Sequence, residues 1–314
     1  MRYRVLGKTK LKLSVLGFGG SALGGTPTAN SSIDSAENTR AVRAAIAGGI
    51  NFFDVSPFYG ATRAEAELGA ALTGVARDKY VLATKVGRYW ENDFDFSTDR
   101  VTRSVDESLK RLKTDHVDIV ECHDIEFGDL DQVINETVPA LCRLKESGKV
   151  RFVGVTGYAM KALWYVAGRV DLDTVMSYCH YTLNDTTLTE LIPFLKDKKV
   201  GILNAAPLGM GLLTGADGAL PAWHPAPEEL RAACREAAAF CRGKGYEIAD
   251  LAVKFSVDQS DITSTLVGMS TVKEVERNIA AIEKAPPAGL LKAVEKVLAP
   301  VKNKVWVSGR VENN

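Results

Sequence analysis

Four polar side chains follow three strand-like segments that lie far apart in the chain. Asp54 lies next to the end of the segment NFFDV and Tyr59 follows five residues later, Lys85 ends YVLATK, and His123 ends VDIVECH. In a parallel α/β fold, the carboxyl ends of the strands meet at one rim, where ligands bind. The pattern therefore predicts one site with an acid, a phenol, an amine and an imidazole, a set of groups suited to moving a proton.

The chemistry of this site depends on what surrounds Tyr59. A tyrosine with an ordinary pKa of about 10 is a poor base at neutral pH. A nearby lysine ammonium stabilises the phenolate, and Asp54 can hold Lys85 in place and keep it charged. We expect Lys85 to make the phenol more acidic while His123 hydrogen-bonds a substrate oxygen. Taken singly, Lys85 could instead be a solvated charge and His123 a core histidine.

A metal site is the alternative use of this rim. Residues His123, Asp124 and Glu126, with His180 from a later strand, carry suitable ligand atoms. The strand pleat sends neighbouring side chains to opposite faces, however, and the sequence has no H-E-x-x-H pattern. We therefore predict no metal.

The segment GFGGSALGG formally fits G-x-G-x-x-A between Gly17 and Ala22. A dinucleotide fingerprint also needs a helix that begins at once, so that its N–H groups meet the pyrophosphate. A TPT segment and a polar loop to Asp34 follow instead, which argues against a Rossmann fold. We expect this glycine segment, with Gly20 and Ser21, to let a ligand approach the backbone at a strand end.

Composition indicates a chain with a large core and no charge bias. A chain of 314 residues buries about 75% of its unfolded surface. Its 39 basic and 39 acidic residues predict binding to neither nucleic acid nor a membrane surface. Five cysteines without a C-x-x-C pair suggest neither a disulfide framework nor a zinc ribbon. Because MRYRVLGKTK lacks the apolar core of a signal peptide, we expect a cytoplasmic protein. We also expect a monomer or a weak homo-oligomer.

Short β-branched runs alternate with helical stretches, which predicts a parallel sheet with crossover helices. After a hairpin around residues 7–10, eight strands are expected, at 15–20, 51–55, 81–85, 117–121, 151–156, 174–178, 201–205 and 264–269. Eight such units fit a single α/β domain over residues 1–314, a (β/α)8 barrel, also called a TIM barrel. An open doubly wound sheet is the alternative that strand counting leaves open.

Four further segments complete this outline. Helices are expected at 99–112, with Asp99 as its cap, and at 129–146, where apolar residues recur at helical spacing. A Gly/Pro-rich loop at 214–227 lies on the predicted rim. The tail 285–314 holds a helical stretch, GLLKAVEKVLAPV, followed by KVWVSGRVENN. Rim loops and tails commonly shape a pocket.

The chain resembles a known family at these motifs. GINFFDVSPFYG resembles the aldo-keto reductase motif around the catalytic tyrosine, and ATK and ECHD follow where that family has its lysine and histidine. The resemblance extends from VLGFGG to LVGMSTVKEVERNIAAI. It implies a (β/α)8 barrel that binds a nicotinamide dinucleotide without a Rossmann fold. It also implies a catalytic tetrad at Asp54, Tyr59, Lys85 and His123.

The resemblance extends to the cofactor site. GVTGY implies that Thr156 holds the carboxamide, and SYCHY stands where a glutamine is usual, so that Ser177 or Tyr178 substitutes. Ala205 occupies the place where an aromatic ring often stacks on the nicotinamide. The implied cofactor positions are Gly20, Ser21, Asp54, Thr156, Ser177, Tyr178, Pro207, Leu208, Met210, Leu212, Gly268, Met269, Ser270, Glu274 and Asn278.

The choice of dinucleotide rests on two of these positions. Family members that prefer the 2′-phosphate usually place Lys or Arg around the positions of Gly268 and Glu274. A carboxylate repels a dianionic phosphate but accepts hydrogen bonds from a ribose diol. We therefore expect NAD, with the adjacent Lys273 as the counter-argument.

Several rim segments resemble a narrower group, the members that oxidise C1 of L-galactose to a lactone with NAD. These segments are FFDVSPFYG, GRYWENDFDFS, CHDIEFGDLDQ, SYCHYTLND, PAWHPA, LVGMS and APVKN. They imply a small sugar as substrate, held beside Tyr59 and His123. Its apolar walls would be Trp90, Phe127, Trp223 and Trp306, for which ordinary packing is the alternative. A dehydrogenase for L-fucose or D-arabinose, an NADPH-dependent carbonyl reductase and a non-catalytic regulatory subunit stay open.

Overall fold

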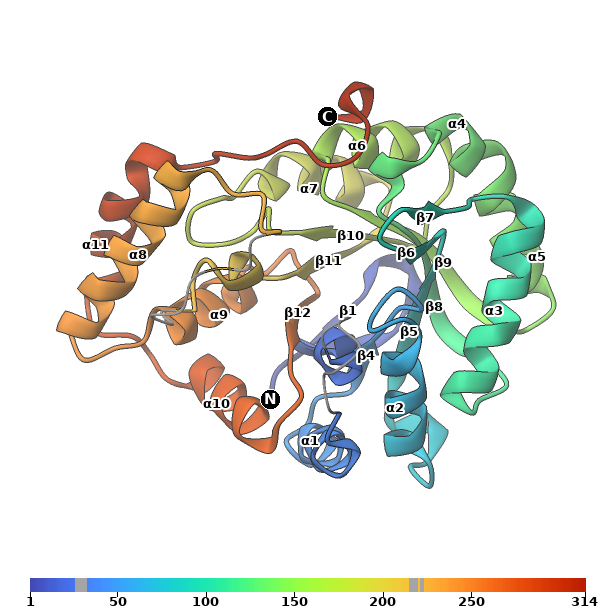
Figure 1. Cartoon of the computed structure of the whole chain (residues 1–314), viewed down its shortest axis with the longest axis horizontal. Helices are drawn as coiled ribbons and strands as arrows, with labels where there is room; N and C mark the ends of the chain where they lie inside the picture. Colours follow the sequence, from blue (N-terminus) through green and yellow to red (C-terminus); the bar gives the residue numbers. More distant parts are fainter. Residues whose placement is uncertain (26–32, 215–219, 221–222) are drawn as a thin grey trace.

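The computed structural model describes residues 1–25, 33–214, 220 and 223–314. Most of the polar loop expected after the glycine segment, and much of the expected rim loop 214–227, lie outside these residues. Figure 1 shows the chain in sequence colours, with the C-terminal tail running from α11 (Leu290–Leu298) across to α6 (Met160–Arg169).

Eight parallel strands form a closed barrel. They are β3 (Leu16–Gly19), β4 (Phe52–Asp54), β5 (Val81–Val86), β8 (Val117–His123), β9 (Val150–Gly157), β10 (Thr174–Tyr178), β11 (Gly201–Ala205) and β12 (Ser264–Gly268). The eight strand predictions are confirmed. Pairing of β12 with β3 closes the sheet, and this excludes the open doubly wound alternative.

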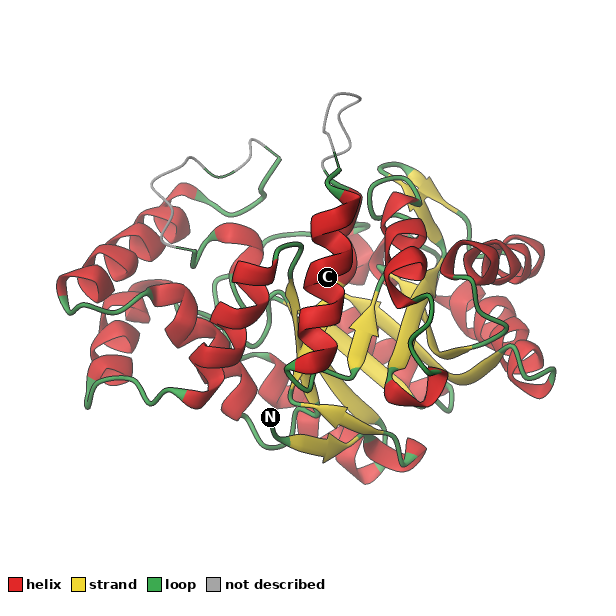
Figure 2. Cartoon of the chain, turned by 90° about the horizontal axis from the view of Figure 1, so that it is seen from below, coloured by secondary structure: helices red, strands yellow, loops and turns green. Residues whose placement is uncertain are grey.

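Helices surround the barrel (Figure 2). They are α1 (Ser35–Ala47), α2 (Arg63–Leu72), α3 (Thr98–Leu112), α4 (Leu130–Gln132), α5 (Val138–Glu146), α6 (Met160–Arg169), α7 (Leu188–Asp197), α8 (Glu228–Gly243), α9 (Ile248–Asp258), α10 (Val272–Glu283) and α11 (Leu290–Leu298). A π-helical turn, Val133–Thr137, joins α4 to α5, so the predicted helix 129–146 is present.

The predicted cap of α3 is wrong by two residues. The N-cap is Ser97, whose side chain accepts a hydrogen bond from the backbone N–H of Arg100 at 3.4 Å. Asp99 lies within the first turn instead. Serine and aspartate both cap helices well, and an aspartate in the first turn still interacts favourably with the helix dipole.

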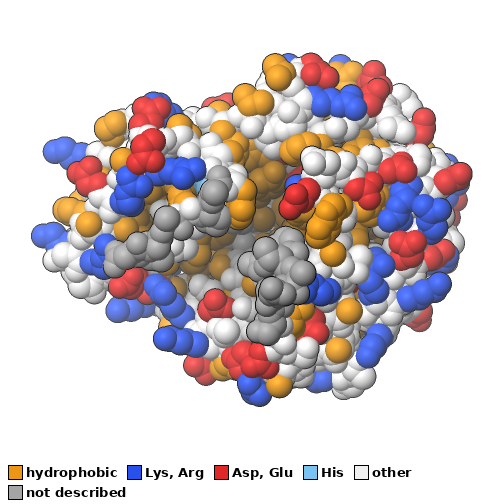
Figure 3. All heavy atoms as spheres, in the orientation of Figure 1, with side chains coloured by type: hydrophobic (Ala, Val, Ile, Leu, Met, Phe, Trp, Pro, Cys, Tyr) orange, Lys and Arg blue, Asp and Glu red, His pale blue; other side chains and the backbone are white. Residues whose placement is uncertain are grey.

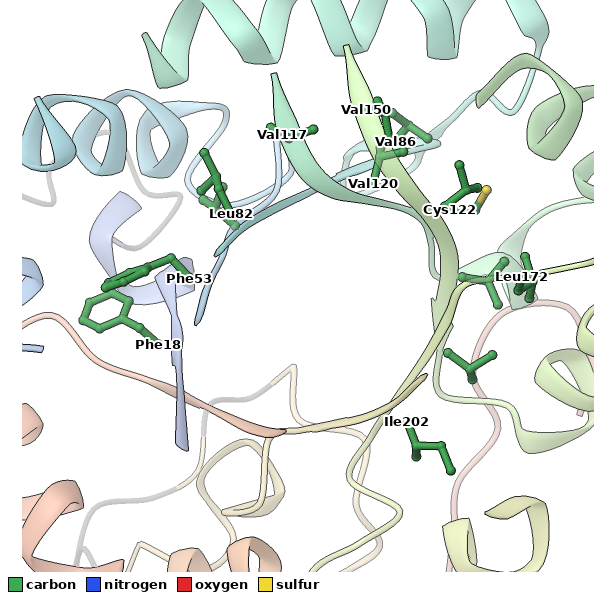
Figure 4. Close-up of a cluster of buried hydrophobic side chains, with 14 of the residues drawn as sticks. Phe18, Phe53, Leu82, Val86, Val117, Val120, Cys122, Val150, Leu172 and Ile202 are labelled. Carbon is green, nitrogen blue, oxygen red and sulfur yellow. The ribbon is translucent and has the colours of Figure 1, made fainter. Parts of the chain in front are cut away.

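The strands separate two apolar layers. Figure 4 shows Phe18, Phe53, Leu82, Val120 and Ile202 outside the ring of strands, facing the helices. Alternate residues face inward and form a second cluster, which includes Phe52, Val81, Ala83, Ile119, Met176 and Leu203. This alternation determines which strand-end residues can reach the barrel interior.

The hairpin predicted around residues 7–10 is present, and it closes the amino-terminal end of the barrel. Strands β1 (Tyr3–Val5) and β2 (Lys12–Ser14) pair antiparallel, and Leu6, Leu11 and Leu13 pack into the interior cluster. The opposite end is the rim where the predicted site residues lie. Two short strands, β6 (Arg88–Trp90) and β7 (Asp93–Phe94), form a second hairpin after β5.

A third apolar cluster joins α8, α9 and α11 beside the barrel, through Leu230, Leu251 and Val294 among others. Within the described ranges, no helix combines the length and the apolar character that a membrane span requires.

Candidate active site

Asp54 and Lys85 form a buried ion pair at the rim. Both residues face the interior, because each lies two residues after an inward apolar residue of its strand. The Lys85 ammonium contacts Asp54 Oδ1 and donates to the carbonyl oxygen of Val55 at 3.2 Å. Burial opposes the charged lysine, but Asp54, Tyr59 and Glu121 together raise the pKa of Lys85. Lys85 is therefore a fixed positive charge.

Tyr59 lies above this pair on the loop after β4. Its ring centroid is 5.2 Å from Lys85 Nζ and 5.7 Å from the centroid of the His123 ring, with the two rings nearly perpendicular. The structure therefore brings together the four residues predicted from three distant segments.

The expected acidity of Tyr59 is not what the structure shows. Burial raises the pKa of Tyr59 to about 12, and the ammonium of Lys85 offsets only part of this effect. The carboxylates of Asp54 and Asp124 act in the same direction as burial. The phenol is thus a proton donor by default, and it needs further positive charge to become a base near neutral pH.

His123 is neutral and oriented. Burial lowers its pKa to about 3, although Asp124 opposes this shift. Its Nδ1 lies 3.0 Å from Ser56 Oγ, which already accepts the N–H of Phe58 at 3.1 Å. The Ser56 hydroxyl can then donate to Nδ1, which leaves the proton on Nε2. Asp124 Oδ2, at 3.6 Å from Nε2, favours the same tautomer.

One wall of the rim is an aromatic cluster around Arg88. The guanidinium lies 3.8 Å from the centroid of the Phe58 ring and pairs with the Asp124 carboxylate. Phe127 stacks on Phe94 with centroids 4.6 Å apart, and both rings lie within cation–π range of Arg88. The predicted wall residue Phe127 is thus at the rim, packed in a cluster.

The C-terminal tail supplies the other wall. Trp306 stacks on Tyr158 with centroids 4.7 Å apart, and its backbone N–H donates to the Tyr158 hydroxyl at 3.2 Å. Trp223 is 68% exposed and stacks on His224, whereas Trp90 is 39% exposed on β6. Figure 3 shows a hollow on this face with hydrophobic side chains along its sides.

The predicted carboxamide-binding residues lie at the ends of β9 and β10. Thr156 is paired in register with His123 and faces the interior. Tyr178 also faces inward, and its hydroxyl donates to Glu126 at 3.3 Å. Ser177 points the other way, with its Oγ 3.7 Å from the sulfur of Met160 on α6. Of the two predicted substitutes, Tyr178 is the one that reaches the rim.

Backbone forms the surface at the ends of β3 and β12. Gly268 is exposed, and a Cβ there would lie 3.5 Å from Ser21 Oγ, the side chain that follows Gly20. Met269 is fully buried in the core, so only its backbone can face a ligand. Ser21 and Gly268 therefore leave an open edge, as a ligand that approaches the backbone requires.

The loop after β11 holds the other predicted cofactor positions. Pro207 and Leu212 are buried, whereas Leu208 and Met210 are half-buried. His224, which the sequence analysis did not single out, fastens this loop: its Nε2 lies 3.0 Å from the carbonyl oxygen of Gly209.

Glu274 caps its own helix. Its Oε2 accepts the backbone N–H of Ser270 at 2.8 Å and of Thr271 at 3.0 Å, and Thr271 Oγ1 accepts the N–H of Glu274. The signal was present in the sequence, because T-x-x-E is a capping box. A second carboxylate, that of Glu37 on α1, accepts the N–H of Val272 at 2.8 Å. Asn278 lies one turn further along α10, half-buried.

The comparisons with known proteins agree with this architecture. Residues 15–298 match the model of the aldo/keto reductase family. The chain belongs to the aldo/keto reductase family. It is an oxidoreductase of that family, and the resemblance seen at its motifs is confirmed.

Individual relatives of this aldo/keto reductase match three quarters of its length or more. An L-galactose dehydrogenase of Arabidopsis thaliana is 50% identical over 99% of this chain and 98% of the relative. A D-arabinose 1-dehydrogenase of Saccharomyces cerevisiae is 31% identical over 75% of this chain and 73% of the relative. An aldo-keto reductase structure from Bacillus halodurans, in its holo form, covers 99% of both chains with a TM-score of 0.79 and 26% identity.

Three rim residues of this aldo/keto reductase have an unusual backbone. Asp124, Cys179 and Ala206 directly follow β8, β10 and β11 and have φ angles of 52°, 64° and 51°. Non-glycine residues rarely adopt this left-handed conformation, and they concentrate at functional sites. Sequence reasoning missed this backbone conformation at all three, because none is a glycine that would signal a left-handed turn.

The groups of the alternative metal site do not converge. His180 Nδ1 bonds Thr187 at 2.8 Å and lies 3.4 Å from Asp185, whereas Glu126 bonds the tail residue Ser308. Over the described part of this aldo/keto reductase, no three His, Cys, Asp or Glu side chains form a metal-ligand set.

Proposed function

We propose that the chain is an NAD-dependent aldose 1-dehydrogenase that oxidises a sugar, L-galactose first among candidates, at C1 to the aldonolactone. The observation that carries this proposal is 50% identity over nearly the whole chain to the L-galactose dehydrogenase of Arabidopsis thaliana. The relative from Saccharomyces cerevisiae is also named as an aldose 1-dehydrogenase, for D-arabinose. The assembled tetrad supports the same reading, because it can transfer the proton that such an oxidation releases.

The rim fits a nicotinamide dinucleotide. The exposed backbone around Gly268 and Ser21 leaves room that a larger side chain would fill. Small and polar inward-facing residues, Ala205, Thr156 and Tyr178, surround the end of the barrel beside the tetrad. When bound there, the dinucleotide would accept the hydride from C1 of the sugar.

Two carboxylates favour NAD over NADP. Glu37 and Glu274 both occupy backbone N–H groups at the start of α10. The bond from the Val272 N–H lowers the pKa of Glu37, so that side chain is ionised. A dianionic 2′-phosphate near this helix end would meet like charge and N–H groups that already have acceptors. The exposed Lys273 offsets part of this repulsion.

The tetrad residues then have separate roles. In the proposed oxidation, the Nε2–H of His123 and the Tyr59 oxygen hold the C1 hydroxyl. Tyr59 takes the hydroxyl proton, and the fixed charge of Lys85 stabilises the phenolate that does so. Asp54 keeps Lys85 charged and in place. The aromatic walls at Phe127 and Trp306 would face the apolar side of the sugar ring.

The test is an assay for formation of the reduced cofactor, NADH or NADPH, by the purified chain. L-galactose, L-fucose, D-arabinose and L-gulose are each supplied with NAD or NADP. We expect turnover with NAD, fastest with L-galactose, and a loss of about 10³-fold or more in Tyr59→Phe with NAD binding unchanged. NAD binding without turnover of any sugar would indicate a regulatory subunit, and near wild-type turnover by Tyr59→Phe would refute the catalytic assignment.

A further inference from the structure

A third carboxyl group lies inside the barrel beside the tetrad. Glu121 is fully buried on β8, two residues before His123, and therefore faces the interior. It is paired in register with Lys85 on the neighbouring strand β5. Register partners in a parallel pair lie side by side, so Glu121 flanks Lys85 from β8 while Asp54 contacts it from β4.

Glu121 also has a hydrogen-bond partner on the side away from Lys85. Thr174 Oγ1 on β10 lies 3.3 Å from Glu121 Oε1. The two residues lie on strands separated by β9, where Gly154 stands between them in register. A Cβ at position 154 would come within 2.0 Å of Thr174 Oγ1, so a residue without a side chain is required for this contact.

The charges in this layer do not balance if every group is ionised. One ammonium, Lys85, faces two buried carboxyls, Asp54 and Glu121, and an unpaired buried charge is costly. One oxygen of each carboxyl has no hydrogen-bond partner, but the other oxygen of Asp54 contacts the ammonium directly, whereas the other oxygen of Glu121 accepts only the neutral Thr174 hydroxyl. Burial raises the pKa of Glu121 to about 8, although Lys85 opposes the shift. Near neutral pH the proton therefore resides on Glu121.

We propose that Glu121 is a positioning residue of this site, a neutral carboxylic acid whose ionisation changes the charge around Lys85 and thereby the basicity of Tyr59. The inference rests on the proposed dehydrogenase function. While Glu121 is protonated, Lys85 has one carboxylate partner and can stabilise the Tyr59 phenolate. Once Glu121 ionises, a second negative charge shares that ammonium and the phenolate becomes harder to form.

The groups that face Glu121 come from three strands. They are Lys85 on β5, Asp54 on β4 and Thr174 on β10, of which only the first two are charged. Tyr59 contacts this set through Lys85. No other described residue contributes a charge that acts on Glu121 to a resolved extent.

The test compares wild type with Glu121→Gln, which mimics the protonated acid at every pH. Sugar oxidation with NAD is followed from about pH 6 to about pH 9.5. At pH values where Glu121 is still protonated, we expect wild type and Glu121→Gln to have equal kcat/KM. At the alkaline end, the variant should be about tenfold faster, which corresponds to a change of about one unit in the pKa of Tyr59. Superimposable profiles would overturn the proposal.

Two further variants separate this role from a structural one. Glu65→Gln removes a fully buried glutamate carboxylate that bonds Thr84 outside the site, and it should leave the shape of the profile unchanged. Thr174→Val removes the hydroxyl that stabilises the Glu121 carboxylate, so Glu121 should ionise at higher pH in this variant. The pH at which kcat/KM falls below that of Glu121→Gln should therefore move upward. A downward move, or none, would contradict the assignment.

An unfolding measurement tests the proton on Glu121 without any turnover. The folded protein holds this proton up to about 8, whereas an unfolded glutamate loses it near 4.5. Between these values the unfolded state binds fewer protons, so the free energy of unfolding falls as pH rises. Wild type should lose stability relative to Glu121→Gln between about pH 5 and pH 8. A difference in stability between wild type and Glu121→Gln that stays constant over this pH range would overturn the proposal. Failure to turn over any sugar would refute only the dehydrogenase function.

Discussion

Burial favours the neutral form of both His123 and Tyr59. Burial and the nearby cations of Lys85 and Arg88 keep His123 neutral, with a pKa of about 3. The same burial keeps the Tyr59 phenol protonated, with a pKa of about 12. Near neutral pH the site thus contains two neutral groups, a hydrogen-bond donor and a weak acid, and the weak acid needs further positive charge to become a base.

A pH profile tests this division. We expect kcat/KM for sugar oxidation to rise with pH, because the reaction needs the Tyr59 phenolate, and the rise to flatten where Glu121 ionises and makes that phenolate harder to form. We expect no inflection near the ordinary histidine pKa of about 6.5, because His123 stays neutral down to about 3. An inflection near 6.5 that disappears in His123→Gln would show that the imidazole titrates.

Ser56 fixes the tautomer of His123. Ser56→Ala removes the hydroxyl 3.0 Å from Nδ1, so the ring can turn or carry its proton on the wrong nitrogen. We expect kcat to fall about 10-fold, in the range known for groups that orient a functional histidine, with KM little changed. The matched control is Ser256→Ala, a buried serine that donates to the Tyr181 carbonyl oxygen at 2.8 Å away from the site. Equal effects would mean that the loss is structural.

At this scale, the sequence predicted which residues meet at the rim and the pairing of Asp54 with Lys85, but not the partners of His123 and Arg88. Asp54, Lys85 and His123 could be found because each ends a strand, and strand ends share a rim. The pairing of Arg88 with Asp124 depends on a left-handed backbone at Asp124 and on a two-stranded hairpin, neither of which has a clear local signal. The pKa of Tyr59 depends on burial by side chains from several elements, so its direction could not be inferred from Lys85 alone.

At the scale of elements, the fold places the two carboxylates proposed to favour NAD at the start of α10. Glu37 reaches it from α1, and Glu274 closes the capping box with Thr271. The strands and main helices followed from periodicity, whereas the contact between α1 and α10 joins segments 235 residues apart. Only the closed barrel, in which β12 and β3 are neighbours, brings these helices together.

The double variant Glu37→Gln/Glu274→Gln tests the electrostatic part of NAD preference. Amides keep the size of both side chains but remove the negative charge at the helix start. We expect NADP to bind about tenfold more tightly and NAD to change much less. Fluorescence titration measures both affinities. Glu276→Gln, an exposed glutamate on the same helix, should change neither affinity. Equal changes for NAD and NADP would contradict the repulsion argument.

At the scale of the whole molecule, the C-terminal tail crosses the rim and is fastened to the loop after β8 (Figure 1). The Glu126 side chain accepts hydrogen bonds from Ser308 Oγ at 3.1 Å and from the Tyr158 N–H at 3.0 Å. The Glu126 carbonyl oxygen accepts the N–H of Arg310 at 3.0 Å and Asn313 Nδ2 at 2.9 Å. This attachment holds Trp306 against Tyr158. A tail of this kind could be expected to shape a pocket, but its anchor was not evident in the sequence.

Gly309 is the residue on which this attachment depends most closely. A Cβ there would lie 2.4 Å from the Glu126 carbonyl oxygen, and φ is +72°. Gly309→Ala should therefore lift the tail and displace Trp306, raising KM for the sugar about 10-fold while NAD affinity stays unchanged. Gly245→Ala is the matched control, because Gly245 has φ +69° with nothing within 4 Å of a new Cβ. Gly245→Ala should introduce a similar backbone strain without the clash. A similar rise in KM in both variants would therefore show that the tail does not form the sugar site.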